Sequence, residues 1–416
     1  MADRKIKEVL QQQLDLLKPT KEEIRNINAQ AEELINKLKS KIRKKKIKAN
    51  VFIGGSLAKG TLVKKEKYDI DIFVRFDKKY PDEEISKLLG KVVAGIKAKK
   101  IHGSRDYFQL RKGKLIYEII PVASIKKPTE ARNVTDLSYF HVNYIKGKIQ
   151  KKKKLADEII LAKSFCYFQN CYGAESYIRG FSGYALELLV CYFGSFVKFL
   201  KTAVIADKMI LDPKRFYKNK NEIMLELNES KLQSPIVFVD PTFKERNALA
   251  ALSGETYEKF KDVAKRFLRS PSKKFFEKFE IDKKQFNFIL EVKTSKQKGD
   301  IAGSKLKKFY EFLSKKIMED FVINKKEFSY DEDKNIAKMY FNVKSRGKIL
   351  IEGPPITAVE HVVRFKKKHK NCFVKAGKAY CRKQTEKNPK IFLANFKEKE
   401  KRILREMNIT KVLVLK

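Results

Sequence analysis

The chain has 416 residues, 43% of them hydrophobic, and its 94 lysines and arginines against 50 acidic residues give a net charge of +44. This length exceeds one compact core and predicts two to four domains, while the hydrophobic content excludes a disordered polycation. A globular protein this basic is expected to bind a polyanion, nucleic acid before a membrane surface. The alternative explanation of the positive charge is that the lysines only supply solubility, or ion pairs at high temperature.

Cysteine use indicates a reducing interior, and the hydropathy pattern indicates that the chain does not span a membrane. The five cysteines are odd in number and contain no Cys-x-x-Cys pair, so we expect neither a zinc site nor a disulfide framework. Met1–Lys18 predicts a charged amphipathic helix rather than an apolar signal region. The most apolar stretch, Tyr184–Leu200, is short and carries Glu187 and Lys198. We therefore expect a buried core helix, no membrane span and a soluble cytoplasmic protein.

The first part of the chain alternates helices and strands in the manner of an α/β unit. Its expected elements are a helix after the capping box Thr20–Glu23, a strand before Gly54, a strand Asp69–Phe76, a helix Glu84–Ala98 and a hairpin of Tyr107–Arg111 and Leu115–Val122. In the strand Asp69–Phe76 the alternation places Ile70 and Ile72 toward the core and both aspartates on the opposite face.

The remainder divides into a helical part and a mixed part. The expected elements are helices through Thr135–Ala203 and Glu255–Leu268, a strand Phe286–Thr294, a helix Lys305–Met318, strands near Asn335–Lys344 and Lys348–Glu352, and a lysine-rich mixture from Ile356. A helix on an antiparallel sheet predicts a small α+β domain. We therefore expect an α+β multidomain protein divided into residues 1–134, 135–272 and 273–416.

Two aspartates and a glutamate suggest metal-dependent chemistry. Asp69 and Asp71 are two residues apart in a strand, so their carboxylates project from one face about 6.6–6.8 Å apart along the strand. Such a pair repels unless cations lie between the carboxylates, and Mg²⁺ prefers one or two carboxylates plus substrate phosphates. Glu118, on the strand expected next to this one, is the candidate third carboxylate of a two-metal site. A solvated strand face is the alternative.

A glycine-rich turn precedes these carboxylates. Gly54, Gly55 and Ser56 offer backbone N–H groups and a hydroxyl to a phosphate, and glycine lets a triphosphate approach the backbone closely. Lys59 adds a cation one helical turn further on. A glycine-serine turn alone is common in loops, but together with the Asp-x-Asp pair it predicts a nucleotide-binding site.

These motifs resemble those of the polymerase-β-like nucleotidyltransferase superfamily, and the rest of the chain is similar to archaeal-type (class I) CCA-adding enzymes. The segments that carry the second resemblance are Lys163–Glu175, Arg179–Leu189, Phe238–Ser253, Ser270–Phe276 and Gly353–Pro355 with His361 and Phe365. It covers most of the chain and is weakest over the final thirty residues.

The resemblance implies specific roles. The implied triphosphate contacts are Ser56, Lys59, His141, Lys163 and Tyr172, the metal carboxylates are Asp69, Asp71 and Glu118, and the residue that helps read the incoming base is Arg246. Glu118 departs from the usual aspartate, and Lys59 stands where arginine is usual. The residues alone favour a core or surface histidine at His141 over a ligand contact. They leave two equal alternatives for Lys163, which either meets an anionic ligand or extends its ammonium to solvent.

The resemblance also implies the function and partners. It predicts a nucleotidyltransferase head, a helical nucleotide-binding centre and a C-terminal tRNA-binding body and tail that add CCA to the tRNA acceptor arm from CTP and ATP with Mg²⁺. The basic run Arg364–Lys370, interleaved with Phe365, His369 and nearby Phe373, suits RNA. A poly(A) polymerase or oligoadenylate synthase, and an inactive tRNA-binding module, are the alternatives. The oligomeric state stays open, a homodimer being one possibility.

Overall fold

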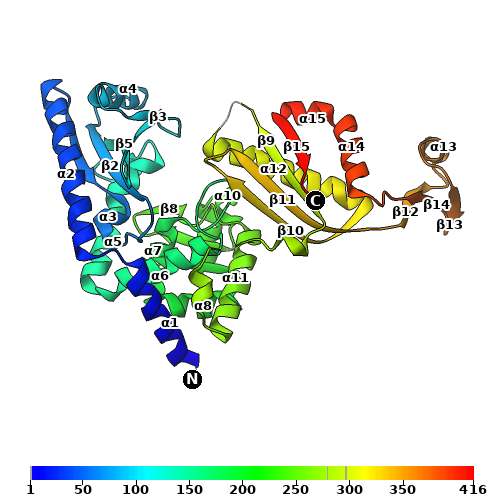
Figure 1. The fold of residues 1–416 in the computed structure, drawn as a ribbon, viewed down its shortest axis with the longest axis horizontal. Helices are drawn as coiled ribbons and strands as arrows, with labels where there is room; N and C mark the ends of the chain where they lie inside the picture. The colour runs from blue at the N-terminus through cyan, green and yellow to red at the C-terminus, as the bar shows by residue number, and fades with distance from the viewer. Residues whose placement is uncertain (1, 279, 296–297) are drawn as a thin grey trace. The chain divides into compact units, whose positions relative to one another are not determined.

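The computed structural model describes residues 2–278, 280–295 and 298–416 (Figure 1); Met1, the first residue of the expected N-terminal helix, lies outside them. The chain divides into two compact units, Met1–Ala174 with Ile178–Phe279 and Glu175–Tyr177 with Glu280–Lys416. Each unit combines helices with sheets, as the α+β expectation requires. The finer division at residues 134/135 and 272/273 stays a prediction.

The first unit begins with helices and a five-stranded sheet. Its elements are α1 (Ala2–Leu17), α2 (Lys21–Lys44), β1 (Ala49–Ile53), α3 (Gly55–Lys59), β2 (Tyr68–Asp77), α4 (Asp82–Val93), β3 (Lys99–Ile101), β4 (Tyr107–Lys112) and β5 (Leu115–Ser124). The capping box is confirmed, because the Thr20 hydroxyl accepts from Glu23 N and the Glu23 carboxylate accepts from Thr20 N. Helix α4 ends at Val93, earlier than the expected Ala98, close to Gly95 in the left-handed region at φ +74°.

The sheet has the order β1-β2-β5-β4-β3, with β2 and β5 parallel. The alternation expected in β2 is confirmed. Ile70, Ile72 and Val74 are fully buried in the core that the sheet forms with α2 and α4, whereas Asp69 is exposed and Asp71 partly buried on the other face. Glu118 on β5 is the register partner of Asp71, so the two side chains share that face.

Helices follow the sheet and build the second core of this unit. They are α5 (Ser138–Lys151), α6 (Lys154–Phe168), α7 (Gly183–Phe193), α8 (Phe196–Ile205), α9 (Lys220–Glu226), α10 (Glu229–Leu232) and α11 (Gly254–Arg269), with short 3-10 turns at Pro128–Glu130, Val134–Leu137 and Lys273–Phe276. Aromatic and aliphatic side chains of α1, α6, α7, α8 and α11 form the core.

The apolar stretch Tyr184–Leu200 was expected to be one helix, and this is wrong. Gly194, at φ +77°, ends α7, and the Ser195 hydroxyl caps α8 by accepting from Lys198 N. Among the described residues no single helix is long and apolar enough to cross a membrane; α7 and α8 reach that length only as a pair bent by 94°.

A small sheet in this unit was not expected from the sequence. Strands β6 (Met209–Leu211), β7 (Ile236–Asp240) and β8 (Phe243–Asn247) pair in that order. All five residues of β7 are buried, and Asp240 and Arg246 lie on β7 and β8. The mainly helical expectation for residues 135–272 therefore holds with this three-stranded exception.

The second unit contains a four-stranded antiparallel sheet covered by helices. It comprises the 3-10 turn Lys283–Gln285, β9 (Phe288–Thr294), α12 (Gly299–Asp320), β10 (Phe321–Asp331), β11 (Ile336–Ser345), α14 (Pro389–Lys399), α15 (Lys401–Glu406) and β15 (Ile409–Val414). The strand order is β10-β11-β9-β15, and α12 and α14 contribute to its core (Figure 1). The expected helix on an antiparallel sheet is confirmed.

A second, smaller sheet in this unit carries a disulfide. Its elements are β12 (Lys348–Pro355), α13 (Val359–Lys368), β13 (Cys372–Lys375) and β14 (Lys378–Gln384), with the strand order β12-β14-β13. Cys372 and Cys381 are register partners on β13 and β14 and form a disulfide. The expectation of no disulfide is therefore wrong, because the hairpin brings two cysteines nine residues apart directly opposite each other. Cys166, Cys171 and Cys191 are not part of this disulfide.

Candidate active site

The glycine turn after β1 fits closely around Asp71. Gly55 has φ +56°, and a β-carbon on it would lie 1.6 Å from Asp71 Oδ2. Gly54 N donates to the Asp71 carbonyl oxygen at 2.8 Å, and a β-carbon on Gly54 would overlap the ring of Phe73. Glycine is therefore required at both positions, because the backbone of the turn packs directly on the side chains of β2.

Asp69 and Asp71 crowd one face of the sheet beside this turn. Burial raises the pKa of Asp71 to about 6, and the charge of Asp69 adds to the rise while Lys59 opposes it. Holding both carboxylates ionised at neutral pH is therefore costly without a cation. Carboxylate oxygens are the ligands that divalent Mg²⁺ takes, so the chemistry of this pair fits such a cation.

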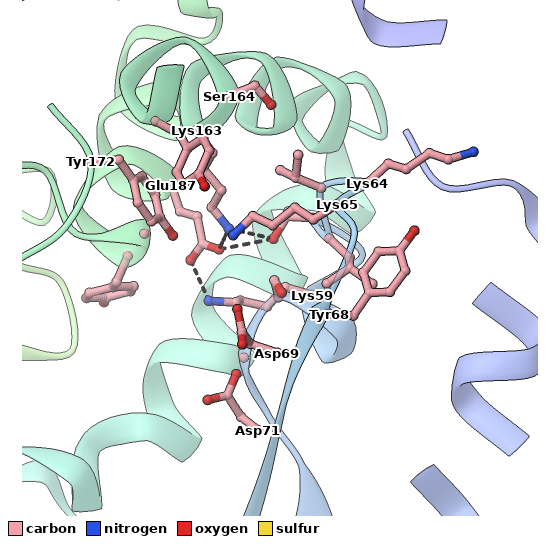
Figure 2. Close-up of a pocket in the computed structure, with 18 of the residues that line it drawn as sticks. Lys59, Lys64, Lys65, Tyr68, Asp69, Asp71, Lys163, Ser164, Tyr172 and Glu187 are labelled. Carbon is pink, nitrogen blue, oxygen red and sulfur yellow. Dashed lines mark hydrogen bonds and ion pairs between the residues drawn. The ribbon is translucent and has the colours of Figure 1, made fainter. Parts of the chain in front are cut away.

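A cavity of about 250 Å³ opens above these aspartates in the first unit (Figure 2). Its walls come from α3, β2, α6 and α7 and from the segments that follow α3 and α6. The lining includes Gly55, Ser56, Lys59, Thr61, Lys64, Lys65, Tyr68, Asp69, Asp71, Lys163, Ser164, Tyr167, Tyr172, Gly183, Tyr184 and Glu187. Carboxylates at one end and ammonium groups further along give the cavity the charge pattern that a metal-bound nucleoside triphosphate requires.

Two of the lysines that line this cavity, Lys59 and Lys163, bond to one buried carboxylate, as Figure 2 shows. Lys59 Nζ is 2.6 Å from Glu187 Oε2, and Lys163 Nζ is 2.8 Å from Glu187 Oε1. Burial alone would raise the pKa of Glu187, but the charges of Lys163 and Lys59 outweigh it and lower the pKa to about 2. The sequence suggested either an anionic ligand or solvent as the environment of the Lys163 ammonium. In the structure its anionic partner is a residue of the chain itself, Glu187.

A second cluster adjoins the cavity through Tyr184. The Tyr184 ring stacks on His141 at a centroid separation of 4.0 Å, and its hydroxyl donates to Asp240 Oδ1 at 3.1 Å. Arg246 donates to Asp240 Oδ2 at 2.5 Å, and His141 Nε2 lies 3.2 Å from the same oxygen. Burial alone would raise the pKa of Asp240, but His141 and Arg246 outweigh it and hold the pKa well below its ordinary range.

The third predicted carboxylate, Glu118, does not line the cavity that Asp69 and Asp71 line. Glu118 shares a face with Asp71 and lies 3.5 Å from Gln109 Nε2 through its Oε1. It is absent from the cavity lining, and within the described residues no three acidic, histidine or cysteine side chains gather into a set that would hold a metal ion. The role of Glu118 as a metal ligand stays a prediction.

The structure thus brings together most of the residues chosen from the sequence. Those lining the cavity are Gly55, Ser56, Lys59, Asp69, Asp71, Lys163 and Tyr172. His141 and Arg246 meet each other at Asp240 beside the cavity, and Glu118 lies on the strand next to Asp71. Their roles stay predictions.

Two residues of the site were missed by sequence reasoning. Glu187 was noted only because it interrupts an apolar stretch, and Asp240 only as part of a resembling segment. Both are fully buried, and buried carboxylates normally need a partner. The charge of Glu187 inside an apolar helix was the one signal that would have pointed to it.

Family models match two parts of the first unit. Residues 31–139 match the nucleotidyltransferase domain, and residues 157–277 match the second domain of tRNA nucleotidyltransferases. The first match contains Asp69, Asp71 and the glycine turn, and the second contains Lys163, Glu187 and Arg246.

Curated relatives are similar to a larger part of the chain. The CCA-adding enzyme of Nanoarchaeum equitans is 36% identical over 62% of this chain and 64% of its own length. The CCA-adding enzyme of Methanocaldococcus jannaschii is 29% identical over 90% of this chain and 87% of its own length. This chain therefore contains one region that matches a nucleotidyltransferase model and one that matches a tRNA nucleotidyltransferase model, and it is similar to archaeal CCA-adding enzymes. The chain spans slightly less than two thirds of the length of the Nanoarchaeum equitans enzyme.

Solved structures of other proteins share the fold of this chain. The Cid1 poly(U) polymerase matches with a TM-score of 0.52 at 13% identity, over 65% of this chain and 98% of that one. A cytoplasmic RNA terminal U-transferase matches with a TM-score of 0.53 at 14% identity, over 67% of this chain and 100% of that one. The polymerase-β-like nucleotidyltransferase fold expected from the sequence is confirmed.

Proposed function

We propose that this chain adds C, C and A in turn to the 3′ end of tRNA from CTP and ATP without a template, releasing pyrophosphate. The observation that carries the proposal is the pair Asp69 and Asp71 at one end of a cavity that also holds Lys59 and Lys163, in a chain whose relatives are CCA-adding enzymes. We also propose that it works in the cytoplasm, where tRNA and nucleotides are available.

Asp69 and Asp71 are proposed to hold divalent cations, specifically Mg²⁺, with Glu118 as a further ligand. When bound, the metal would lower the pKa of the tRNA 3′-hydroxyl and neutralise charge on the departing pyrophosphate. The chain's own contribution is to fix the carboxylates rigidly, because the Gly55 backbone and the β2 strand leave Asp71 little freedom. In-line transfer of a nucleotidyl group needs no covalent protein intermediate, so positioning and charge stabilisation supply most of the catalysis.

The triphosphate is proposed to lie along the cationic part of the cavity. Ser56 offers its hydroxyl and backbone N–H, Lys59 and Lys163 offer charge, and Tyr172 lines the same wall. All of them surround a single cavity, so one site would accept both CTP and ATP.

The residues that meet at Asp240 are proposed to contact the nucleotide's base and nearby phosphates. Arg246 carries donors in a planar fork that suits the edge of a base, and its bond to Asp240 fixes one of those donors. His141 Nε2 is buried and lies 3.2 Å from Asp240 Oδ2, poorly aligned for a hydrogen bond. A ligand acceptor beside it would complete its hydrogen bonding, which supports the proposed contact with the nucleotide.

Asp71→Asn tests the proposal directly. Single-turnover addition of CMP to a tRNA that lacks CCA should fall by at least about 100-fold, while tRNA affinity stays near that of the native chain because lysines elsewhere provide it. Asp77→Asn is the matched control, since Asp77 ends the same strand and its carboxylate accepts from the nearby Lys79 N. Addition by Asp71→Asn within about tenfold of native would exclude the metal role of Asp71.

A further inference from the structure

Glu187 is an acidic residue in a cavity that we propose binds an anion. Its side chain is fully buried, and the side chains of Lys59 and Lys163 that contact it are only 9% and 7% exposed. Thr61 completes the cluster, since its hydroxyl donates to Glu187 Oε1 at 3.1 Å and accepts from Lys163 Nζ at 3.0 Å. A carboxylate here reduces the positive charge offered to a triphosphate, so its presence needs an explanation.

The cluster joins three separate elements. Lys59 ends α3, Lys163 lies within α6 and Glu187 lies within α7. Two ammonium groups removed from water repel each other and lose hydration, and either one is then expected to deprotonate or turn away. A carboxylate bonded to both, with Thr61 satisfying remaining hydrogen bonds, offsets these costs.

We propose that Glu187 is a positioning residue that keeps Lys59 and Lys163 in place, both charged, before the incoming nucleotide binds. The inference rests on the proposed function, because it assigns the two lysines to the triphosphate. Pre-organised cations lose less conformational freedom when the ligand arrives, so the anion binds more tightly despite the extra negative charge. The cluster keeps a net charge of +1 from two lysines and one glutamate, which still attracts a triphosphate.

Two other roles for Glu187 predict different changes in nucleotide affinity when its charge is removed. If Glu187 acted only through its charge, its neutralisation would remove repulsion and tighten the binding of nucleotides. If it merely stabilised the fold, its neutralisation would lower thermal stability and leave the affinity of the folded protein unchanged. Affinity and stability measured on the same variant therefore separate the three accounts.

The experiment compares Glu187→Gln with the native chain. Glutamine has nearly the same shape and keeps an oxygen for Thr61, but it removes the charge that holds the lysines. We expect the Kd of Mg²⁺-ATP, measured calorimetrically without RNA, to rise by about tenfold or more. The rate of addition at saturating nucleotide should change much less, since Glu187 is not proposed to touch the reacting atoms.

Two controls keep the result specific. Glu158→Gln alters a second glutamate of the same unit, which is partly buried and whose carboxylate accepts from Phe196 N at 2.8 Å. The Kd of this variant for ATP should match the native value even if its Tm falls. In a Lys163→Gln background, Glu187→Gln should raise the Kd by much less than it does alone, because one of its two partners is gone.

An unchanged or lower Kd in folded Glu187→Gln would overturn the inference. If that variant does not fold, Glu187→Asp decides: it keeps the charge but withdraws the carboxylate by one methylene, so a native Kd would also overturn the inference. The native chain is assayed in parallel for addition to tRNA. Failure of native addition refutes the proposed function, whereas native addition with an unaltered Kd in the variant refutes this inference alone.

Discussion

A β-carbon on Gly55 would lie 1.6 Å from the Asp71 carboxylate oxygen Oδ2, so the two residues fit together only because Gly55 has no side chain. Gly55→Ala should therefore displace Asp71 and reduce nucleotide addition by about 100-fold or more, while tRNA binding is retained. Single-turnover addition and tRNA Kd measured side by side give the test.

Gly60→Ala is the matched control for Gly55→Ala. Gly60 also has a positive φ, +69°, but apart from its chain neighbours no heavy atom of the described residues lies within 4 Å of the β-carbon position. Both alanines carry similar backbone strain, of order 1 kcal/mol, and only Gly55→Ala meets Asp71. Equal activities of the two variants would show that backbone strain, not the contact with Asp71, accounts for the loss.

Glu118 gives a prediction about charge and reach. Glu118→Asp should keep or improve nucleotide addition, since aspartate is the usual residue in the resembling family, and Glu118→Gln should lose it because a metal ligand needs the negative charge. The dependence of the rate on Mg²⁺ concentration provides the measurement. Full activity of Glu118→Gln at low Mg²⁺ would remove Glu118 from the metal site and leave Asp69 and Asp71 as the protein ligands.

The net charge of +44 predicts strong salt dependence of tRNA binding. Each phosphate that a lysine neutralises releases about 0.7–0.9 counterions, so log Kd should rise steeply with log salt. Lys366, Lys367 and Lys368 are exposed in the last turn of α13, and replacing all three by glutamine should flatten the slope. Replacing them by arginine keeps the charge and should leave the slope unchanged. Equal slopes for the native and glutamine variants would exclude α13 from the RNA contact.

Glu187 also predicts how stability depends on pH. Its pKa is lowered from 4.5 to about 2 on folding, so its ionised form stabilises the fold above about pH 4.5 and this contribution disappears as the pH falls toward about 2. The shift corresponds to roughly 3 kcal/mol. The free energy of unfolding in urea should fall more steeply over this range for the native chain than for Glu187→Gln. Parallel curves would contradict an ionised Glu187 bonded to both lysines.

Much of the five-stranded sheet could be predicted from the sequence, because the patterns that specify its strands are local. Alternation in β2 placed Asp69 and Asp71 on one face, and the capping box located the start of α2. The hairpin of β4 and β5 placed Glu118 on a strand that proved to be the neighbour of β2. These inferences depend on residues within one or two turns of each other.

The rest of the site depends on contacts that a sequence pattern does not reveal. Lys59 and Glu187 bond across a separation of 128 residues, so the position of one in the sequence does not predict its contact with the other. Asp240 lies at the end of β7, a strand of five buried residues, whose short apolar run does not distinguish a strand from a helix. The disulfide was missed for a similar reason, because only the register of β13 with β14 places Cys372 opposite Cys381.

The central claim is tested most directly by sequencing the products made from a tRNA that lacks its terminal CCA, supplied with CTP and ATP together. The proposal predicts that the native chain adds C, C and A and then stops, also on a minihelix of the acceptor stem and its adjoining arm, and that Asp71→Asn adds nothing. Long homopolymeric tails would contradict the proposal in favour of another template-independent polymerase. No addition by the native chain would contradict it in favour of an inactive tRNA-binding module.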